Sequence, residues 1–158
     1  MLIFISRFLL LALPFYFILW LNFDAYPLQL LTANAVSFIL TILNVEYELN
    51  GHLIFIPSVL WTIEIIKDCV GWKSLMALWG LIFATRGICY KTKVYGALAG
   101  IPLIFIGNAI RIASSIWLAI MFGLDKFTFI HDFLWQWGLI ALVLGIWWVW
   151  LGKTTVRN

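Results

Sequence analysis

Long apolar stretches dominate the sequence, and they restrict the chain to a membrane protein. Of the 158 residues, 65% are hydrophobic and only 11% are charged, which is more apolar surface than a soluble domain of this size can bury. Each of five stretches offers the about 17–25 residues that a transmembrane helix needs. These stretches are 2–21, 27–44, 71–88, 94–122 and 131–151. We therefore predict an all-α polytopic membrane protein with about five transmembrane helices.

The positions of lysine and arginine predict how the chain is oriented in the membrane. Basic residues cluster near 86–93 and in the tail after 151. Loops separated by two spans lie on the same side, so both clusters are expected to be cytoplasmic. Segment 45–70 is mainly acidic and would face outward together with 123–130. Arg7 disagrees with the outward N-terminus that this arrangement requires.

The outer segment 45–68 has the alternation of a β-structure and not the period of a helix. In "VEYELNGHLIFIP", Asn50-Gly51 is a strong signal for a hairpin turn. A third run, "WTIEIIKDC", also alternates, with Thr62, Glu64 and Asp68 on one face. We expect a small extracytosolic antiparallel β-hairpin element whose last strand delivers Cys69 to the third helix.

The chain is predicted to form one integral membrane domain over 1–158. Within it we expect two N-terminal spans (1–44), the outer β-element (45–68) and a three-helix core (69–151). The basic residues are scattered, so a nucleic-acid partner is not indicated. The two cysteines are far apart and form no CxxC motif, so neither a metal site nor another cofactor is predicted.

Polar side chains inside the fourth span require an explanation, because buried charge is costly in a bilayer. In "GNAIRIASSIW", Asn108, Arg111 and Ser115 are spaced three and four apart and form one stripe on a helix. Arg111 could instead reach the outer headgroups while Asn108 joins neighbouring helices. The stripe could also line the path of a small anion channel or transporter.

Two further segments carry candidate reactive groups at the same outer level. His131 and Asp132 open the fifth span, although His131 could be an interfacial residue and Asp132 could serve only the helix dipole. Cys69 lies at the outer end of the third span, whereas Cys89 lies at its cytoplasmic end and is expected to be a small apolar packing residue. A thiol, a guanidinium and an imidazole are therefore predicted to meet on the outer side.

These three groups could perform nucleophilic catalysis on a peptide bond. The helix start and the charge of Arg111 could lower the pKa of the Cys69 thiol. Arg111 and Asn108 could stabilise an oxyanion, and His131 could protonate the leaving amine. Gly71 would allow the substrate backbone to approach closely.

The motifs resemble those of the exosortase/archaeosortase family of membrane cysteine transpeptidases. In that family a Cys-Ser-Gly motif opens one membrane helix, an Asn-x-x-Arg motif lies near the outer end of the next, and a histidine opens a later one. The corresponding stretches here are "DCVGWKSLMAL", "GNAIRIASS" and "FIHDFLWQWG". Val70 stands where that family has serine. The resemblance covers about 45–150, and the short chain is most like a compact archaeosortase.

The resemblance implies a function and a role for each candidate residue. Cys69 would be the nucleophile, Arg111 would stabilise the thiolate or oxyanion, and His131 would be the general acid and base. Asn108, Gly71 and Asp132 would support them. The enzyme would be a multi-pass cell-membrane protein with its site on the extracytosolic side. Its substrates would be surface-protein precursors with a C-terminal transmembrane sorting signal, and the acceptor would be a lipid-type anchor.

Overall fold

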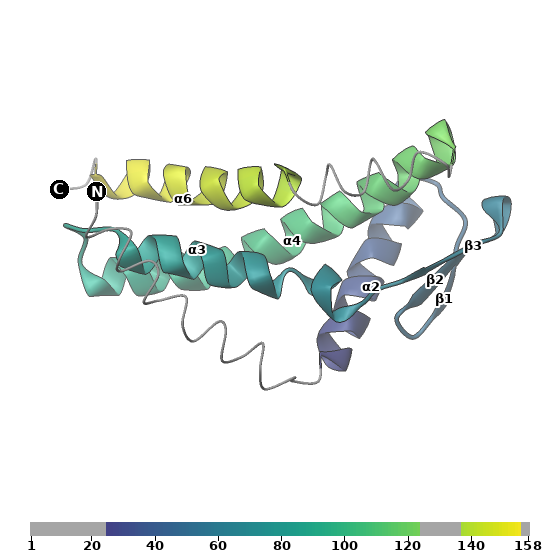
Figure 1. The fold of residues 1–158 in the computed structure, drawn as a ribbon, viewed down its shortest axis with the longest axis horizontal. Helices are drawn as coiled ribbons and strands as arrows, with labels where there is room; N and C mark the ends of the chain where they lie inside the picture. The colour runs from purple at the N-terminus through teal and green to yellow at the C-terminus, as the bar shows by residue number, and fades with distance from the viewer. Residues whose placement is uncertain (1–24, 124–136, 156–158) are drawn as a thin grey trace. The chain divides into compact units, whose positions relative to one another are not determined.

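A computed structural model describes residues 25–123 and 137–155 (Figure 1). The contacts divide the chain into two compact units. The sheet unit comprises 24–71 and 105–139, and the helical unit comprises 1–23, 72–104 and 140–158. The first predicted span, 2–21, lies outside the described residues. The prediction of a single domain over 1–158 stays a prediction.

The described elements begin with one helix, continue with three short strands and two 3₁₀ turns, and end with three helices. In chain order they are α2 (Tyr26–Ile42), β1 (Glu48–Asn50), β2 (Leu53–Ile56), the 3₁₀ turn η1 (Pro57–Val59), β3 (Trp61–Glu64), the 3₁₀ turn η2 (Lys67–Val70), α3 (Trp72–Ala84), α4 (Tyr90–Phe122) and α6 (Leu139–Thr155).

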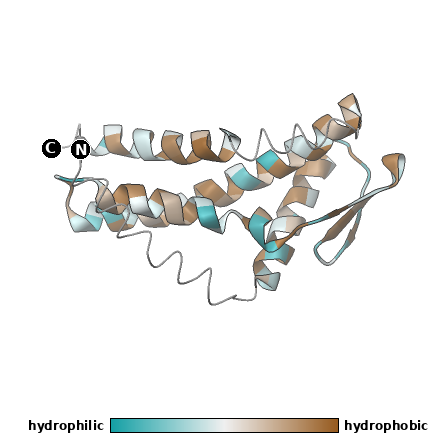
Figure 2. Ribbon diagram, in the orientation of Figure 1, coloured by the Kyte–Doolittle hydropathy of each residue, from teal (hydrophilic) through white to brown (hydrophobic). Residues whose placement is uncertain are grey.

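Among the described helices, α4 alone is long and apolar enough to cross a membrane. Its 33 residues extend over about 50 Å at about 1.5 Å per residue, more than the about 30 Å of a bilayer core. The helices α2, α3 and α6 are apolar but shorter. Figure 2 shows hydrophobic positions along all four helices, with a few hydrophilic positions between them. The count of five spans stays a prediction.

The third span is shorter than the predicted 71–88, because α3 ends at Ala84. Nζ of Lys93, in the first turn of α4, donates hydrogen bonds to the carbonyl oxygens of Phe83 and Thr85. These bonds satisfy acceptors that a helix end leaves open. Gly87 then reverses the chain with a φ of +77°. The basic stretch near 86–93 therefore includes the start of α4.

The helical unit is held together by aliphatic packing between α3, the first part of α4, and α6. Leu78 and Ile82 are fully buried against Ile104 and Val143. Gly96 and Gly100 of α4 allow the close approach of neighbouring side chains, as small residues four apart do in membrane helices. An added Cβ at Gly96 would lie 2.8 Å from two ring atoms of Trp150, and one at Gly100 would lie 2.5 Å from Cδ2 of Leu78.

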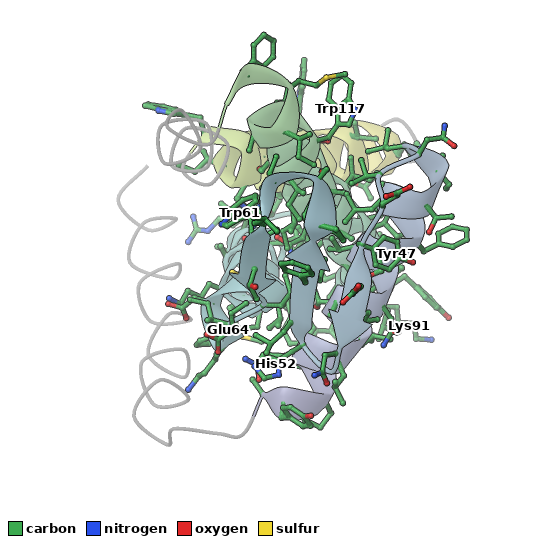
Figure 3. The ribbon with its side chains drawn as sticks, turned by 90° about the vertical axis from the view of Figure 1, so that its right-hand side faces the viewer. Tyr47, His52, Trp61, Glu64, Lys91 and Trp117 are labelled. Carbon is green, nitrogen blue, oxygen red and sulfur yellow. The ribbon has the colours of Figure 1, made fainter. Side chains whose placement is uncertain are left out.

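The sheet unit contains a three-stranded antiparallel sheet in the order β1-β2-β3. Gly51, between β1 and β2, has a φ of +62°, as a tight two-residue turn requires. Ile54 and Ile56 of β2 are fully buried. Figure 3 looks toward this sheet and shows Trp61 and Glu64 along one edge, with Tyr47 on the opposite side.

The third strand is shorter than the alternation in the sequence predicts. It ends at Glu64, and the backbone leaves the ladder after Ile65 donates its N–H to the oxygen of His52 at 3.0 Å. His52 belongs to the turn that precedes β2, so β2 offers no further residue to pair with beyond it. Asp68 consequently lies in η2 and not on the strand face with Thr62 and Glu64.

Candidate active site

Cys69 is held in a short turn that precedes the helix. It lies in η2, where its N–H donates to the oxygen of Ile66 at 2.9 Å. The preceding backbone is fixed by Gln29 of α2, whose Nε2 donates to the oxygen of Ile65 at 2.9 Å. Gly71, with a φ of +80°, separates this turn from α3, which begins at Trp72. The thiol therefore does not stand in the first turn of the helix.

Asn108 connects the cysteine turn to α4. Its side chain is 1% exposed, and Nδ2 donates to the backbone oxygen of Cys69 at 2.6 Å. Oδ1 accepts hydrogen bonds from Nε and Nη2 of Arg111 at 3.3 and 3.2 Å. One amide therefore places the cysteine backbone and the guanidinium group at a single site.

Arg111 is the charged centre of this arrangement and is 9% exposed. Within the described residues, its Nη1 is buried and has no hydrogen-bond partner. Oγ of Ser115 donates to the backbone oxygen of Arg111 at 2.8 Å. A buried donor without a partner is costly, so Nη1 is available to an anionic or carbonyl oxygen.

Gly71 is closely covered by Asn108. An added Cβ would lie 3.3 Å from Cγ and Nδ2 of Asn108. The sequence suggested that this glycine leaves room for a substrate backbone, but the nearest group is a side chain of the protein itself. Gly71 supports the site by combining a left-handed backbone with close packing against Asn108.

Burial dominates the electrostatics of the Cys69 thiol. Removal from water raises the pKa of Cys69, and the negative charges of Asp68 and Glu64 act in the same direction. A hydrogen bond with the Ile66 backbone and the positive charge of Arg111 oppose this effect without overcoming it. The pKa of Cys69 is therefore raised and not lowered, because burial is the largest contribution and Gly71 separates the cysteine turn from the start of α3.

A cavity of about 260 Å³ opens beside Cys69 within the sheet unit. One side is formed by β3 and the residues that follow it, and the other side is formed by α4. The lining residues are Trp61, Thr62, Ile63, Glu64, Ile65, Ile66, Cys69, Ile112, Ser115 and Ile116. Cys69 therefore borders a cavity that is lined by β3, the residues that follow it, and α4.

The comparison with protein families identifies what kind of chain carries this site. The family model described as transmembrane exosortase matches residues 1–151. The chain belongs to the transmembrane exosortase family. Exosortases are cysteine-type transpeptidases of membranes that act on sorting signals. The comparisons with curated proteins and with solved structures found no match.

Two of the candidate residues of this exosortase, His131 and Asp132, lie outside the described residues. Gly138, which follows them in the chain, lies beside Arg111, since an added Cβ would be 4.0 Å from Cδ of Arg111. Cys89 is an exposed free thiol in the helical unit. Over 25–123 and 137–155 no cluster of three or more His, Cys, Asp or Glu residues could hold a metal ion.

Sequence reasoning missed two features of the site. Asn108 contacts the backbone of Cys69 and not its thiol, and no motif reveals a bond between residues 39 positions apart. Ile112 and Ile116 of α4 line the cavity, although the sequence presents them only as ordinary apolar residues of a span. The i, i+4 spacing from Asn108 to Ile112 and on to Ile116 was the available signal.

Proposed function

We propose that this exosortase is a membrane-embedded cysteine transpeptidase that cleaves C-terminal sorting signals of surface-protein precursors at the outer membrane face. Cys69 is the nucleophile, Arg111 the oxyanion stabiliser and His131 the general acid and base. The observation that carries the proposal is the hydrogen-bonded connection from Cys69 through Asn108 to Arg111. The compact archaeosortases are the branch that the sequence motifs most resemble.

The first step requires a base, because burial raises the pKa of the Cys69 thiol and so favours its protonated form. His131 accepts the thiol proton as Sγ of Cys69 attacks the carbonyl carbon of the scissile peptide bond. A carbon–sulfur bond forms, and the carbonyl π electrons move to the oxygen. When this oxyanion collapses, the carbon–nitrogen bond breaks, and the leaving amine takes the proton from His131. The product is a thioester on Cys69.

Arg111 is held in place by Asn108 and keeps one donor for the developing oxyanion. Nε and Nη2 are occupied by Asn108, which fixes the plane of the guanidinium group. Nη1 is left without a partner in the described residues. A preorganised donor in a water-poor site contributes about 2.7–4 kcal/mol to transition-state stabilisation. A third hydrogen bond, from Nη1 of the immobilised arginine, would therefore act mainly in the transition state.

The second step transfers the acyl group to an acceptor. A hydroxyl or amine of a lipid-type anchor attacks the thioester carbonyl, and its proton passes to His131. The carbon–sulfur bond breaks, and the released Cys69 thiolate takes the proton from His131. Water in place of the acceptor gives hydrolysis. A site at the membrane surface favours the anchor, because a lipid headgroup is concentrated there. The sorting signal of the precursor would remain as a separate membrane helix.

The test is processing of a co-expressed precursor by single-residue variants. Cys69→Ala and Cys69→Ser should abolish processing while the enzyme still accumulates in the membrane. Arg111→Lys should reduce it strongly, because an ammonium group cannot both hold the Asn108 oxygen and offer a second planar donor. Cys89→Ser is the matched control and should process normally. Normal processing by Cys69→Ala would end the proposal.

The anion-channel alternative has less support from the described contacts. Asn108 and Ser115 are 1% and 2% exposed. Both groups of the Asn108 amide and the Ser115 hydroxyl are bonded to protein atoms. A path for ions requires polar groups that face a water-filled space. Anion flux in proteoliposomes separates the two functions, since a channel would conduct after Cys69→Ala.

A further inference from the structure

One edge of the sheet in the sheet unit lacks a partner strand among the described residues. The order β1-β2-β3 makes β3 an edge strand. Figure 3 shows Trp61 and Glu64 along this edge. An edge strand presents N–H and C=O groups that can pair with another extended chain.

The register shows which backbone groups of β3 face outward. Ile65 donates its N–H to the oxygen of its opposite residue, His52, at 3.0 Å. Hydrogen-bonded and non-hydrogen-bonded pairs alternate along an antiparallel ladder. Trp61 and Ile63 therefore also direct their N–H and C=O groups toward β2. Thr62 and Glu64 direct theirs to the open side.

This open side borders the cavity beside Cys69. The cavity lining includes every residue from 61 to 66, and it reaches the cysteine at the end of that run. Opposite the strand, Ile112 and Ile116 of α4 form an apolar wall, and they are 7% and 1% exposed. The volume of about 260 Å³ lies just below the about 300–1,000 Å³ of small-molecule sites. It suits one or two side chains of an extended chain.

We infer that β3 binds the precursor by strand addition, as an extended peptide that pairs with Thr62 and Glu64 and leads its scissile bond to Cys69. This inference rests on the proposed function and specifies how that site holds its substrate. Residues with outward groups recur about every 6.6–6.8 Å along a strand. Only a polypeptide backbone carries donors and acceptors at that repeat, so neither an acyl chain nor a simple anion matches the edge.

Strand addition also determines which substrate residues matter. Successive side chains of a bound strand point to opposite faces. Every second residue would therefore face the cavity between β3 and α4, where Ile112 and Ile116 favour an apolar side chain. The intervening residues would point away from the cavity and tolerate polar replacements. The enzyme would recognise a pattern of period two before its cleavage point and not a single side chain.

The inference is tested by removing one outward N–H at a time. Thr62→Pro and Glu64→Pro delete donors that β2 does not use, and proline is tolerated at such edge positions. The substrate is a fluorescent peptide that spans the cleavage site of the processed precursor. Each proline variant should raise the KM for this peptide about tenfold relative to the alanine variant at the same position, as expected when a buried hydrogen bond is left unmade. The rate of Cys69 alkylation by iodoacetamide should be unchanged.

The opposite edge provides the matched control. Leu49 of β1 stands opposite Ile54, and Ile54 directs its backbone groups toward β3. The N–H of Leu49 therefore faces away from the sheet, as that of Thr62 does. Leu49→Pro makes the same chemical change on the wrong edge and should leave KM unchanged. An equal rise in KM for Leu49→Pro and Thr62→Pro would contradict the inference.

A second measurement does not depend on folding of the proline variants. Peptides with a single N-methyl group at successive positions are offered to the unaltered enzyme. Strand addition predicts that methylation reduces processing at alternate positions only. A uniform effect, or none, overturns the inference while cleavage of the unmethylated peptide upholds the proposed function. Cleavage by Cys69→Ala would overturn the proposed function itself.

Discussion

Asn108→Ala is the most informative single change in the site, because one side chain carries three hydrogen bonds there. The variant leaves the Cys69 oxygen without its donor and frees Nε and Nη2 of Arg111. Asn108 is 1% exposed, so water does not readily replace the lost amide. We expect both the stability of the protein and its processing rate to fall.

The structure sets the expected size of this effect. The bonds from Arg111 involve a charged donor and contribute about 1.5–3 kcal/mol together, and the neutral bond to Cys69 contributes about 0.5–1.5 kcal/mol. The free energy of unfolding should fall by about 2–4.5 kcal/mol. If the same amount is lost in the transition state, processing slows roughly 30- to 2,000-fold at about 1.36 kcal/mol per tenfold.

Asn108→Asp separates the two halves of the interaction. A carboxylate still accepts hydrogen bonds from Arg111 but cannot donate to the Cys69 oxygen. The variant should keep most of the stability that Asn108→Ala loses and should still process slowly, because the cysteine turn is no longer held. Stability equal to that of Asn108→Ala would show that the bonds to Arg111 contribute little.

The assay combines thermal unfolding in detergent with the rate of precursor processing. Asn34→Ala is the matched control, because Asn34 is an exposed residue of α2 whose Nδ2 donates to the Leu30 oxygen at 2.8 Å. It should change neither quantity by more than a few tenths of a kcal/mol. Unaltered stability and processing in Asn108→Ala would refute the idea that this amide holds the site together.

Two further predictions concern the cysteine turn. Gly71→Ala and Gly87→Ala carry the same conformational cost of about 1–2 kcal/mol, because both glycines have a φ near +80°. Only the methyl group added at Gly71 would also crowd Asn108. Unfolding and processing assays should therefore show a larger loss for Gly71→Ala, and equal losses would contradict that packing. In Cys89→Ser, which leaves Cys69 as the single cysteine, the pH at half-maximal alkylation should lie above the about 8.5 of a free thiol, because burial raises the pKa of Cys69. The midpoint should rise further when Arg111→Gln is added, because the guanidinium charge lowers this pKa. Because folding raises the pKa of Cys69, the neutral thiol stabilises the folded protein. This stabilisation is fully present below the pKa of the thiol in the unfolded chain and is lost as the pH rises through the pKa of the thiol in the folded protein. A midpoint at or below that of a free thiol would show that burial does not control the group.

One contact within the candidate site could be predicted from the sequence, and another could not. The spacing of Asn108 and Arg111 on one helix was sufficient to place them together, because i, i+3 neighbours face each other on a helix. Their connection to Cys69 could not be predicted, because it depends on how η2 packs against α4. Residues 39 positions apart share no local periodicity.

The boundaries that were wrong have identifiable physical causes. Alternation continues through Asp68 in the sequence, but β3 ends at Glu64 because β2 begins only after His52 and offers no further partner. The predicted third span likewise extends to residue 88, but α3 stops at Ala84, where Nζ of Lys93 donates to the backbone oxygens of Phe83 and Thr85. In both cases a partner distant in sequence, and not the local pattern, determines where the element ends.

The central claim is that Cys69 forms a covalent bond with the carbonyl carbon of its substrate. The most direct measurement incubates the purified full-length enzyme with a peptide spanning the cleavage site, traps the reaction with acid and locates the adduct by mass spectrometry. The account predicts a thioester on the fragment that contains Cys69 and none on the fragment that contains Cys89. An adduct on Cys89, or cleavage by Cys69→Ala with no adduct on either cysteine, would contradict it.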